Sequence, residues 1–378
     1  MISKTARASA VLAFGLAVSG CIFVVPAEEL EAARDRVPAA PDPTAPRLDA
    51  LETSVFPSVP ADAEMVGAVQ VLFTRYENTF SAIAREYDLG YEALRRANPG
   101  VDHWLPGEGT PVYLPTRSIL PDAPRDGIVI NLPSMRLYYF SDRRDEEGGE
   151  VMTVTTYPIG IGRQGWGTPV GTATVTEKVV DPVWYVPASV RQEHAEQGDP
   201  LPAVVPPGPE NPLGRHAMAL SMPGYLIHGT NKPAGVGMRV SHGCIRLYPE
   251  DIEALFERVP RGTPVHIVNQ PVLAGWNDGE LYLEVHRPLD EDERDLAREA
   301  DEAIAAALRR SGRADVELDR AAIARVVAEQ RGIPFPIGMS AMPFDEYLAA
   351  SRIVENTTPL PQSETAAAAD VPDALPED

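Results

Sequence analysis

Short apolar runs broken by glycine or proline dominate residues 127–268. Such runs predict β-strands. The predicted strands are 128–132, 136–140, 151–159, 172–178 and 263–268. A helix is predicted at 249–259, with Pro249 in its first turn. Many short strands separated by turns favour a mainly β domain of the β-sandwich or barrel type.

The stretch 186–216 interrupts this pattern, because it is rich in proline and shows no regular apolar spacing. A segment of this length without regular structure inside a compact domain is usually functional. We expect a lid or a wall of the substrate cleft.

A smaller unit is predicted ahead of the β domain, at 66–120. Its pattern is a strand at 70–75, helices at 79–87 and 91–97, and a strand at 112–115. Thr79 is a suitable N-cap, and Asn98-Pro99-Gly100 stops the second helix. The order β-α-α-β predicts a small α+β module.

Beyond the β domain, residues 279–286 alternate as a strand. Residues 300–309 and 319–330 place alanine and branched apolar residues at helical spacing among charges. We therefore expect a helical C-terminal extension at 279–338.

The two ends of the chain have other patterns. A basic start is followed by an apolar run at 8–18, which is typical of a secretory signal and too short to span a membrane. Residues 22–65 and 357–378 are rich in Pro, Ala and acidic residues, so we predict a disordered tether and a disordered tail.

The net charge of the chain limits the classes of partner that it is expected to bind. The formal net charge is −22, which disfavours nucleic acid as a partner.

The chain has two cysteines, Cys21 and Cys244. A nucleophilic thiol in an oxidising compartment is safer without a second thiol to trap it.

Residues 226–247 concentrate the chemistry. Apolar residues precede His228 and Ser241, so both His-Gly steps should lie where a strand opens into a loop. Cys244 beside a histidine is typical of a thiol nucleophile, and we expect a protonated histidine to lower the pKa of the thiol. Gly243 removes side-chain bulk before Cys244, so backbone N–H groups there could form an oxyanion hole.

Two other interpretations fit parts of this stretch. Cys244 and the histidines could be ordinary buried residues, but so many reactive residue types rarely gather in one window. Zinc could bind two histidines and a cysteine, but His242 and Cys244 are two residues apart and no second cysteine is near. We expect no metal.

His228 followed by Ser241-His242-Gly243-Cys244-Ile245-Arg246 resembles the signature of the L,D-transpeptidases, the YkuD-domain enzymes of bacterial cell-wall synthesis. The resemblance implies Cys244 as nucleophile and His228 as proton donor and acceptor, with His242 and Gly243 forming the oxyanion site or acyl pocket. It implies substrate-binding roles for Ser241, Arg246, Gly229 and Thr230. With arginine at position 246, the signature resembles that of the ErfK/YbiS-like periplasmic branch, which attaches a lipoprotein to peptidoglycan.

The resemblance also implies a reaction without cofactor. The donor would be a tetrapeptide stem, whose diaminopimelate is joined to an acceptor amine with release of D-Ala. A lipoprotein lysine is the favoured acceptor, and a second diaminopimelate, which would crosslink the wall, is the alternative. A non-catalytic wall-binding lipoprotein is a further hypothesis, but it predicts loss of Cys244 or His228. A papain-like peptidase is disfavoured, because there the histidine lies far downstream of the cysteine.

Two further resemblances concern location. Val18-Ser19-Gly20-Cys21 resembles a lipobox, which implies a lipoprotein signal peptide at 1–21 and a lipid on Cys21. Ile22 after the cysteine implies the outer membrane, and so a periplasmic enzyme of a Gram-negative cell. The module at 66–120 resembles LysM, which binds glycans that contain N-acetylglucosamine, although Glu77-Asn78 replaces the usual Gly-Asp. A module that only supports the catalytic domain is the alternative.

Overall fold

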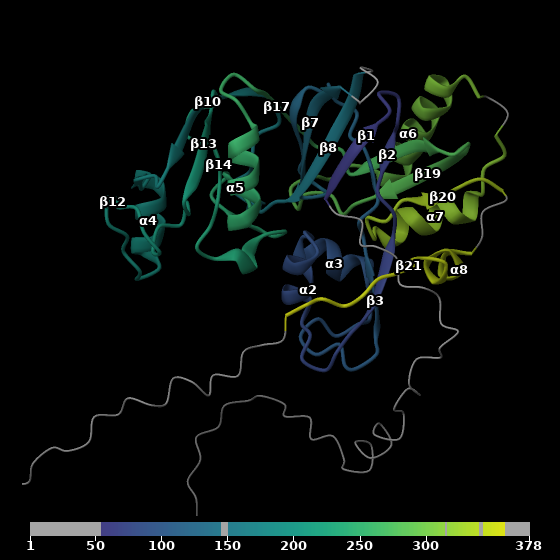
Figure 1. The fold of residues 1–378 in the computed structure, drawn as a ribbon, viewed down its shortest axis with the longest axis horizontal. Helices are drawn as coiled ribbons and strands as arrows, with labels where there is room; N and C mark the ends of the chain where they lie inside the picture. Colours follow the sequence, from purple (N-terminus) through teal and green to yellow (C-terminus); the bar gives the residue numbers. More distant parts are fainter. Residues whose placement is uncertain (1–53, 145–149, 314–315, 340–342, 360–378) are drawn as a thin grey trace, which may run out of the picture. The chain divides into compact units, whose positions relative to one another are not determined.

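A computed structural model describes residues 54–144, 150–313, 316–339 and 343–359. A nine-stranded mixed sheet forms its largest element, in the order β1-β8-β7-β6-β17-β10-β13-β14-β16 (Figure 1). These strands are β1 (Val55–Val59), β6 (Gly127–Asn131), β7 (Arg136–Arg144), β8 (Glu150–Pro158), β10 (Gly171–Val180), β13 (His216–Leu220), β14 (Leu226–His228), β16 (Ile245–Arg246) and β17 (Pro264–Val268).

The mainly β class is therefore confirmed, but the predicted sandwich or barrel is too specific. The main sheet is a single curled sheet, half of a barrel, with β1 and β16 at its ends. Alternation along a strand shows which residues are buried, but it does not show which strands pair.

Helix α5 (Pro249–Arg258) begins with the predicted proline and packs against β13 (Figure 1). Its buried residues Ile252 and Leu255 join the core of the sheet. On β6, Ile128 and Ile130 belong to this core, while Val129 faces a second cluster on the other side of the strand. Both faces of the strand are thus covered, which explains its almost continuous apolar sequence.

The insertion between β10 and β13 contains more regular structure than we expected. It forms β11 (Trp184–Tyr185), α4 (Ala188–Glu196) and β12 (Val204–Val205), and β11 pairs with β12. The prediction of an irregular segment is wrong here. Only Val190 of α4 is buried, so the helix has no apolar stripe that its sequence could reveal.

The N-terminal module consists of β3 (Gln70–Phe73), α2 (Phe80–Glu86), α3 (Tyr91–Ala97) and β4 (Pro111–Leu114). Thr79 caps α2 as predicted, since its side chain accepts the N–H of Ala82 at 3.2 Å. Asn98 ends α3 and exchanges hydrogen bonds with the backbone of Tyr113, which ties the helix to β4.

A distant segment completes this module. Strand β21 (Arg352–Ile353) pairs with β3 in parallel, and helix α8 (Phe344–Ala349) precedes it. The N–H of Thr357 then donates to the hydroxyl of Tyr87 at 2.8 Å. Residues 357–359, which we placed at the start of the disordered tail, therefore lie against the module.

The tether also contributes to the fold. Residues 54–65 were assigned to it by composition, yet β1 forms the edge of the main sheet and β2 (Met65–Val66) pairs with β5 (Ser118–Ile119). Pro57 lies within β1, where an edge strand tolerates a residue that cannot donate.

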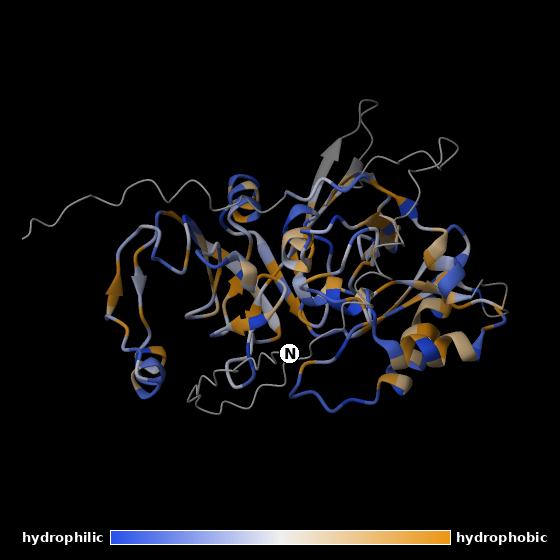
Figure 2. Cartoon of the chain, turned by 90° about the horizontal axis from the view of Figure 1, so that it is seen from below, coloured by the Kyte–Doolittle hydropathy of each residue, from blue (hydrophilic) through white to orange (hydrophobic). Residues whose placement is uncertain are grey.

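The C-terminal unit is a three-stranded sheet with helices against it. It comprises β18 (Val272–Asn277), β19 (Glu280–Val285), β20 (Phe335–Pro336), α6 (Leu296–Ser311) and α7 (Arg320–Glu329). Strand β18 was missed and begins before the predicted boundary at 279. The helices mix hydrophobic and hydrophilic residues (Figure 2), with Ala300, Ile304 and Ala307 buried on α6.

No helix within the described ranges combines the length and the apolar character needed to cross a membrane. The predicted signal peptide and Cys21 lie outside the described residues, as do residues 22–53 of the tether and 360–378 of the tail.

Candidate active site

The two reactive residues are brought together by a parallel pair of strands. Strand β14 pairs with β16 so that Ile227 lies beside Ile245, and His228 beside Arg246. Both isoleucines are fully buried in the main core. Because side chains alternate along a strand, His228 and Arg246 point to the opposite face, and Cys244 just before β16 shares that face.

His228 is held in one tautomer. The residue is 3% exposed, and Nδ1 lies 2.6 Å from the carbonyl oxygen of Gly229. A carbonyl only accepts, so Nδ1 carries the proton and Nε2 keeps its lone pair. Burial and the nearby charge of Arg246 lower the pKa of His228 to about 3, so the imidazole is neutral at physiological pH.

Cys244 is partly exposed and its thiol donates to the carbonyl of Gly224, with 3.7 Å between Sγ and the oxygen. Burial raises the pKa of Cys244, and a backbone hydrogen bond from Leu226 and the charge of Arg246 only partly offset this. The expectation of a thiolate activated by a protonated histidine is therefore wrong for the resting protein. A neutral thiol lies on the same face as a neutral imidazole, which suits removal of the proton during attack.

Ser241 and Gly243 shape the turn that presents the cysteine. The hydroxyl of Ser241 donates to the carbonyl of Cys244 at 2.6 Å and accepts the N–H of Gly243 at 3.2 Å. The predicted oxyanion donor at Gly243 is thus engaged within the loop. Gly243 has a φ of 104°, and a Cβ there would lie 2.9 Å from the ring of Tyr225. Thr168, which we did not single out for the site, donates to the carbonyl of Gly243 at 2.8 Å.

His242 meets a carboxylate that sequence reasoning missed. Its Nε2 lies 2.8 Å from Oε2 of Glu193 on α4 and 3.1 Å from Nη2 of Arg163. Arg163 also pairs with Glu193, and the ring of Trp166 contacts that of His242 edge-on, at 4.8 Å between centroids. The insertion therefore contacts the residue two positions before Cys244. No local pattern links residues so far apart in the chain.

Arg246 places a cation at the same site. Its backbone exchanges hydrogen bonds with Gly160 at 2.7 and 2.9 Å, which fixes its position. Its buried Nε has no hydrogen-bond partner among the described residues, and burial lowers its pKa. The half-buried guanidinium places a positive charge beside His228, which suits an incoming carboxylate.

Gly229 and Thr230, predicted to bind substrate, lie inside the loop that follows His228. Gly229 supplies the carbonyl that orients the imidazole. Thr230 is 4% exposed, and its hydroxyl accepts the N–H of Lys232 at 2.9 Å. Both contacts support the loop, so a direct substrate contact stays a prediction.

The loop between the two reactive residues is packed against the N-terminal module. Gly237 and Gly90 meet backbone to backbone, and the N–H of Glu92 donates to the carbonyl of Gly237 at 3.2 Å. The side chain of Met238 packs against the module's core, and the hydroxyl of Tyr248 donates to the carbonyl of Leu89. The module therefore supports the active-site loop directly.

The loop is held on its other side as well. Strand β15 (Arg239–Ser241) pairs with β9 (Ile161–Gly162) in parallel, and a 3₁₀ turn, η1 (Pro233–Gly235), precedes it. Within the described ranges, no group of three or more His, Cys, Asp or Glu side chains is placed to hold a metal ion.

Comparison with known proteins identifies a family. Residues 125–267 match the family model YkuD, the L,D-transpeptidase catalytic domain. The chain is 44% identical to the probable L,D-transpeptidase YcfS of Escherichia coli (strain K12) over 248 residues, which are 64% of this chain and 75% of that one. It is 41% identical to the probable L,D-transpeptidase YbiS of the same strain over 286 residues, 73% of this chain and 90% of that one.

This chain belongs to the L,D-transpeptidase family. Among solved structures, an L,D-transpeptidase from Mycobacterium smegmatis is similar at 19% identity and a TM-score of 0.29, over 38% of this chain and 58% of that one. Membership of the family means that the chain is an enzyme, and the family acts on peptidoglycan. The predicted family and enzyme class are thus confirmed, including the relation to the ErfK and YbiS proteins.

The protonation states of this L,D-transpeptidase lead to a pH test. Because the folded protein keeps the Cys244 proton above the ordinary cysteine pKa of about 8.5, the thiolate fraction should still be rising at that pH. We expect alkylation of Cys244 by iodoacetamide to accelerate steadily from neutral pH to beyond that value. Stopped alkylation at a series of pH values, followed by mass spectrometry, measures this. A plateau near neutral pH would instead reveal a preformed thiolate and imidazolium.

Proposed function

We propose that the enzyme transfers the acyl group of a peptidoglycan tetrapeptide stem through a thioester on Cys244. Sγ attacks the carbonyl of diaminopimelate at its bond to the terminal D-Ala. A C–S bond forms, the C–N bond breaks, and D-Ala leaves with the proton from the thiol. The observation that carries this proposal is the thiol of Cys244 on the same strand face as a neutral, oriented His228.

His228 moves the proton in this mechanism. With Nδ1–H bound to the carbonyl of Gly229, Nε2 is the basic position of the neutral ring. It accepts the thiol proton as Sγ attacks and then donates it to the departing amine of D-Ala. A pKa of about 3 in the resting protein means that the imidazole reaches this step unprotonated.

Two groups stabilise negative charge in the proposed mechanism. Since the N–H of Gly243 donates to Ser241, we assign the oxyanion contact to the N–H of Cys244 rather than to both groups. Arg246, whose charge lies beside His228 on the same strand face, would hold a carboxylate of the donor stem. Both assignments refine the roles that the family signature implied.

In the second half-reaction an amine attacks the thioester, the C–S bond breaks, and the amine proton returns to Sγ through His228. We propose a lipoprotein C-terminal lysine as the main acceptor. The insertion supports this, because Glu193 of α4 contacts His242 and so brings α4 beside the reactive cysteine. A cleft walled in this way admits a flexible chain end more readily than a folded partner. A second diaminopimelate is the alternative acceptor.

Muropeptide analysis distinguishes the two acceptors. Mass spectrometry would compare the walls of cells with the wild-type enzyme and cells with the Cys244→Ala variant at equal abundance. We expect loss of stem peptides that carry the lysine of a lipoprotein. Loss only of linkages between two diaminopimelate residues would assign crosslinking instead.

Anchoring and wall contact complete the proposal. Tyr76 and Trp104 are 68% and 63% exposed on two loops of the N-terminal module. A hydrogen bond from the N–H of Tyr76 to the carboxylate of Glu108 joins these loops. Such aromatic side chains can stack on the face of a sugar ring, which supports wall binding by a LysM-like module. Retention of the protein on purified peptidoglycan would check this binding.

Lipidation of Cys21, periplasmic location and outer-membrane attachment stay predictions, and fractionation of a Cys21→Ser variant would check them.

A further inference from the structure

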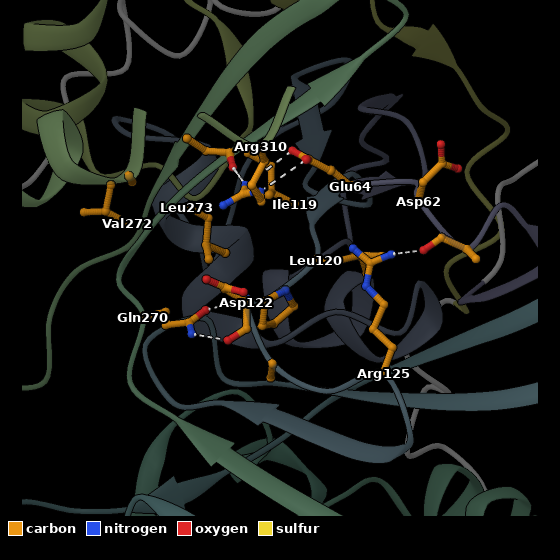
Figure 3. Close-up of a pocket in the computed structure, with 15 residues that line it drawn as sticks. Asp62, Glu64, Ile119, Leu120, Asp122, Arg125, Gln270, Val272, Leu273 and Arg310 are labelled. Carbon is orange, nitrogen blue, oxygen red and sulfur yellow. Dashed lines mark hydrogen bonds and ion pairs between the residues drawn. The ribbon is translucent and has the colours of Figure 1, made fainter. Parts of the chain in front are cut away.

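A cavity lies in a part of the fold that contributes none of the active-site residues. Its volume is about 350 Å³, within the range of small-molecule sites. Its walls come from residues 61–64, from the linker 119–125, from β18 and from α6 (Figure 3). Leu120, Val272 and Leu273 give it an apolar side.

Several polar groups of this cavity are already satisfied. Glu64 pairs with Arg310 at 3.4 Å and also accepts the N–H of Trp276 at 2.9 Å. The side-chain amide of Gln270 exchanges two hydrogen bonds with the backbone of Asp122, at 2.8 and 2.9 Å (Figure 3). These contacts link the walls of the cavity, and they occupy hydrogen-bonding groups of Glu64, Arg310 and Gln270 that a ligand would otherwise use.

Arg125 is different. Among the described residues, its guanidinium makes one hydrogen bond, from Nη1 to the carbonyl of Ala61 at 2.9 Å, and no ion pair (Figure 3). Burial lowers the pKa of Arg125, the nearby charge of Glu64 opposes this, and the charge of Arg310 lowers it further. Nearby carboxylates favour the charged form, but none within the described ranges forms an ion pair with Arg125, so a ligand carboxylate would supply that contact.

Two carboxylates complement this arginine. Asp62 and Asp122 line the cavity, are exposed, and form no ion pair within the described ranges. Their charges are close enough to raise the pKa of Arg125. The cavity thus offers one unused cation, two unused anions and an apolar wall.

We propose that this cavity binds a zwitterionic α-amino acid group, with its carboxylate on Arg125 and its ammonium at Asp62 or Asp122. Leu120, Val272 and Leu273 would contact the aliphatic part. Two sources offer this chemistry: a free amino acid such as D-alanine, and the free end of a diaminopimelate on a stem peptide. The inference is independent of the acceptor that the active site uses.

Titration calorimetry on the full chain tests the site, with Cys244 blocked by iodoacetamide so that no turnover occurs. The ligands are D-alanine, meso-diaminopimelate, a disaccharide-tripeptide, acetate and ethylamine. We expect the amino acids to bind roughly tenfold or more tightly than acetate or ethylamine, since each of these supplies only one of the two charges. Tighter binding of the disaccharide-tripeptide than of D-alanine assigns the wall as the source, and the reverse assigns the free amino acid.

Variants make the test specific. Arg125→Gln should weaken amino-acid binding about tenfold or more, while Arg320→Gln, an exposed ion-paired arginine on α7, should leave it unchanged. If Arg125→Gln fails to fold, the double change Asp62→Asn and Asp122→Asn, at two exposed positions, should weaken it as well. Equal binding by wild type and Arg125→Gln would overturn the proposal, as would acetate binding as tightly as D-alanine.

Discussion

Replacement of Cys244 by alanine should abolish release of D-Ala from a tetrapeptide stem while the fold survives. Loss of a catalytic nucleophile lowers kcat by roughly 10⁴-fold or more in enzymes of this kind. The thiol's hydrogen bonds are to the backbone of Gly224, at a long 3.7 Å, and of Leu226, so the folded state loses little with the sulfur. Release of D-Ala measured by chromatography, together with a thermal melting curve, gives both readouts.

A second variant separates the nucleophile from its base. His228→Gln keeps a donor for the carbonyl of Gly229 but removes the basic Nε2, so turnover should fall while alkylation of Cys244 at high pH persists. Cys244→Ala, by contrast, should lose alkylation at this position altogether. Near-wild-type release of D-Ala by either variant would contradict the proposed thioester mechanism.

The sequence was most informative where chemistry and local pattern coincide. Apolar residues before His228 and Ser241 predicted strand ends, and both residues lie at the ends of β14 and β15. Thr79 and Pro249 were predicted as helix-start residues, and each serves there. These features depend on a few neighbouring residues, so the chain carries them in its local order.

What the sequence did not reveal depends on residues far apart in the chain. Glu193 reaches His242 through a helix that exposes most of its surface, and no apolar stripe marks that helix. Thr168 and Gly243 meet across a separation of 75 residues. Such contacts are set by strand pairing across the sheet, which alternation alone leaves open.

The protonation states of His228 and Cys244 also differ from what the sequence predicted. A histidine near a cysteine predicts an ion pair when both groups are hydrated, but burial favours the neutral form of each. His228 is almost fully enclosed and has Arg246 beside it, so its protonated form is disfavoured twice. Burial and the arrangement of charges are three-dimensional properties, and for that reason the protonation state required the structure.

Substitution of Gly237 by alanine should have the second largest effect, although Gly237 takes no part in the chemistry. Its Cβ would lie 2.2 Å from Cα of Gly90 and 2.4 Å from the backbone nitrogen of Tyr91. Backbone atoms cannot rotate away as a side chain can, so the active-site loop or the module must move. We expect stability to fall by about 3 kcal/mol or more and kcat/KM by roughly 100-fold, since small displacements of catalytic groups are this costly.

Gly237→Ala also introduces backbone strain from a positive φ, so a control variant must measure that strain separately. Gly237 has a φ of 77°, and alanine is strained there whatever surrounds it. Gly262 has a φ of 88° with nothing within 4 Å of its added Cβ, so Gly262→Ala measures that strain by itself. We expect this variant to lose about 1 to 3 kcal/mol and to keep its kcat/KM.

Gly90→Ala tests the same contact from the module's side, without strain from the dihedral angle. Gly90 precedes α3 with an ordinary φ of −79°, and its Cβ would meet Cα of Gly237 at 2.9 Å. If the module holds the loop between His228 and Cys244 in place, this change should lower kcat/KM although it lies in a different unit from the cysteine. Unfolding curves and D-Ala release for the three variants decide the matter. A Gly90→Ala enzyme with wild-type activity would mean that the module packs against the loop without restraining it.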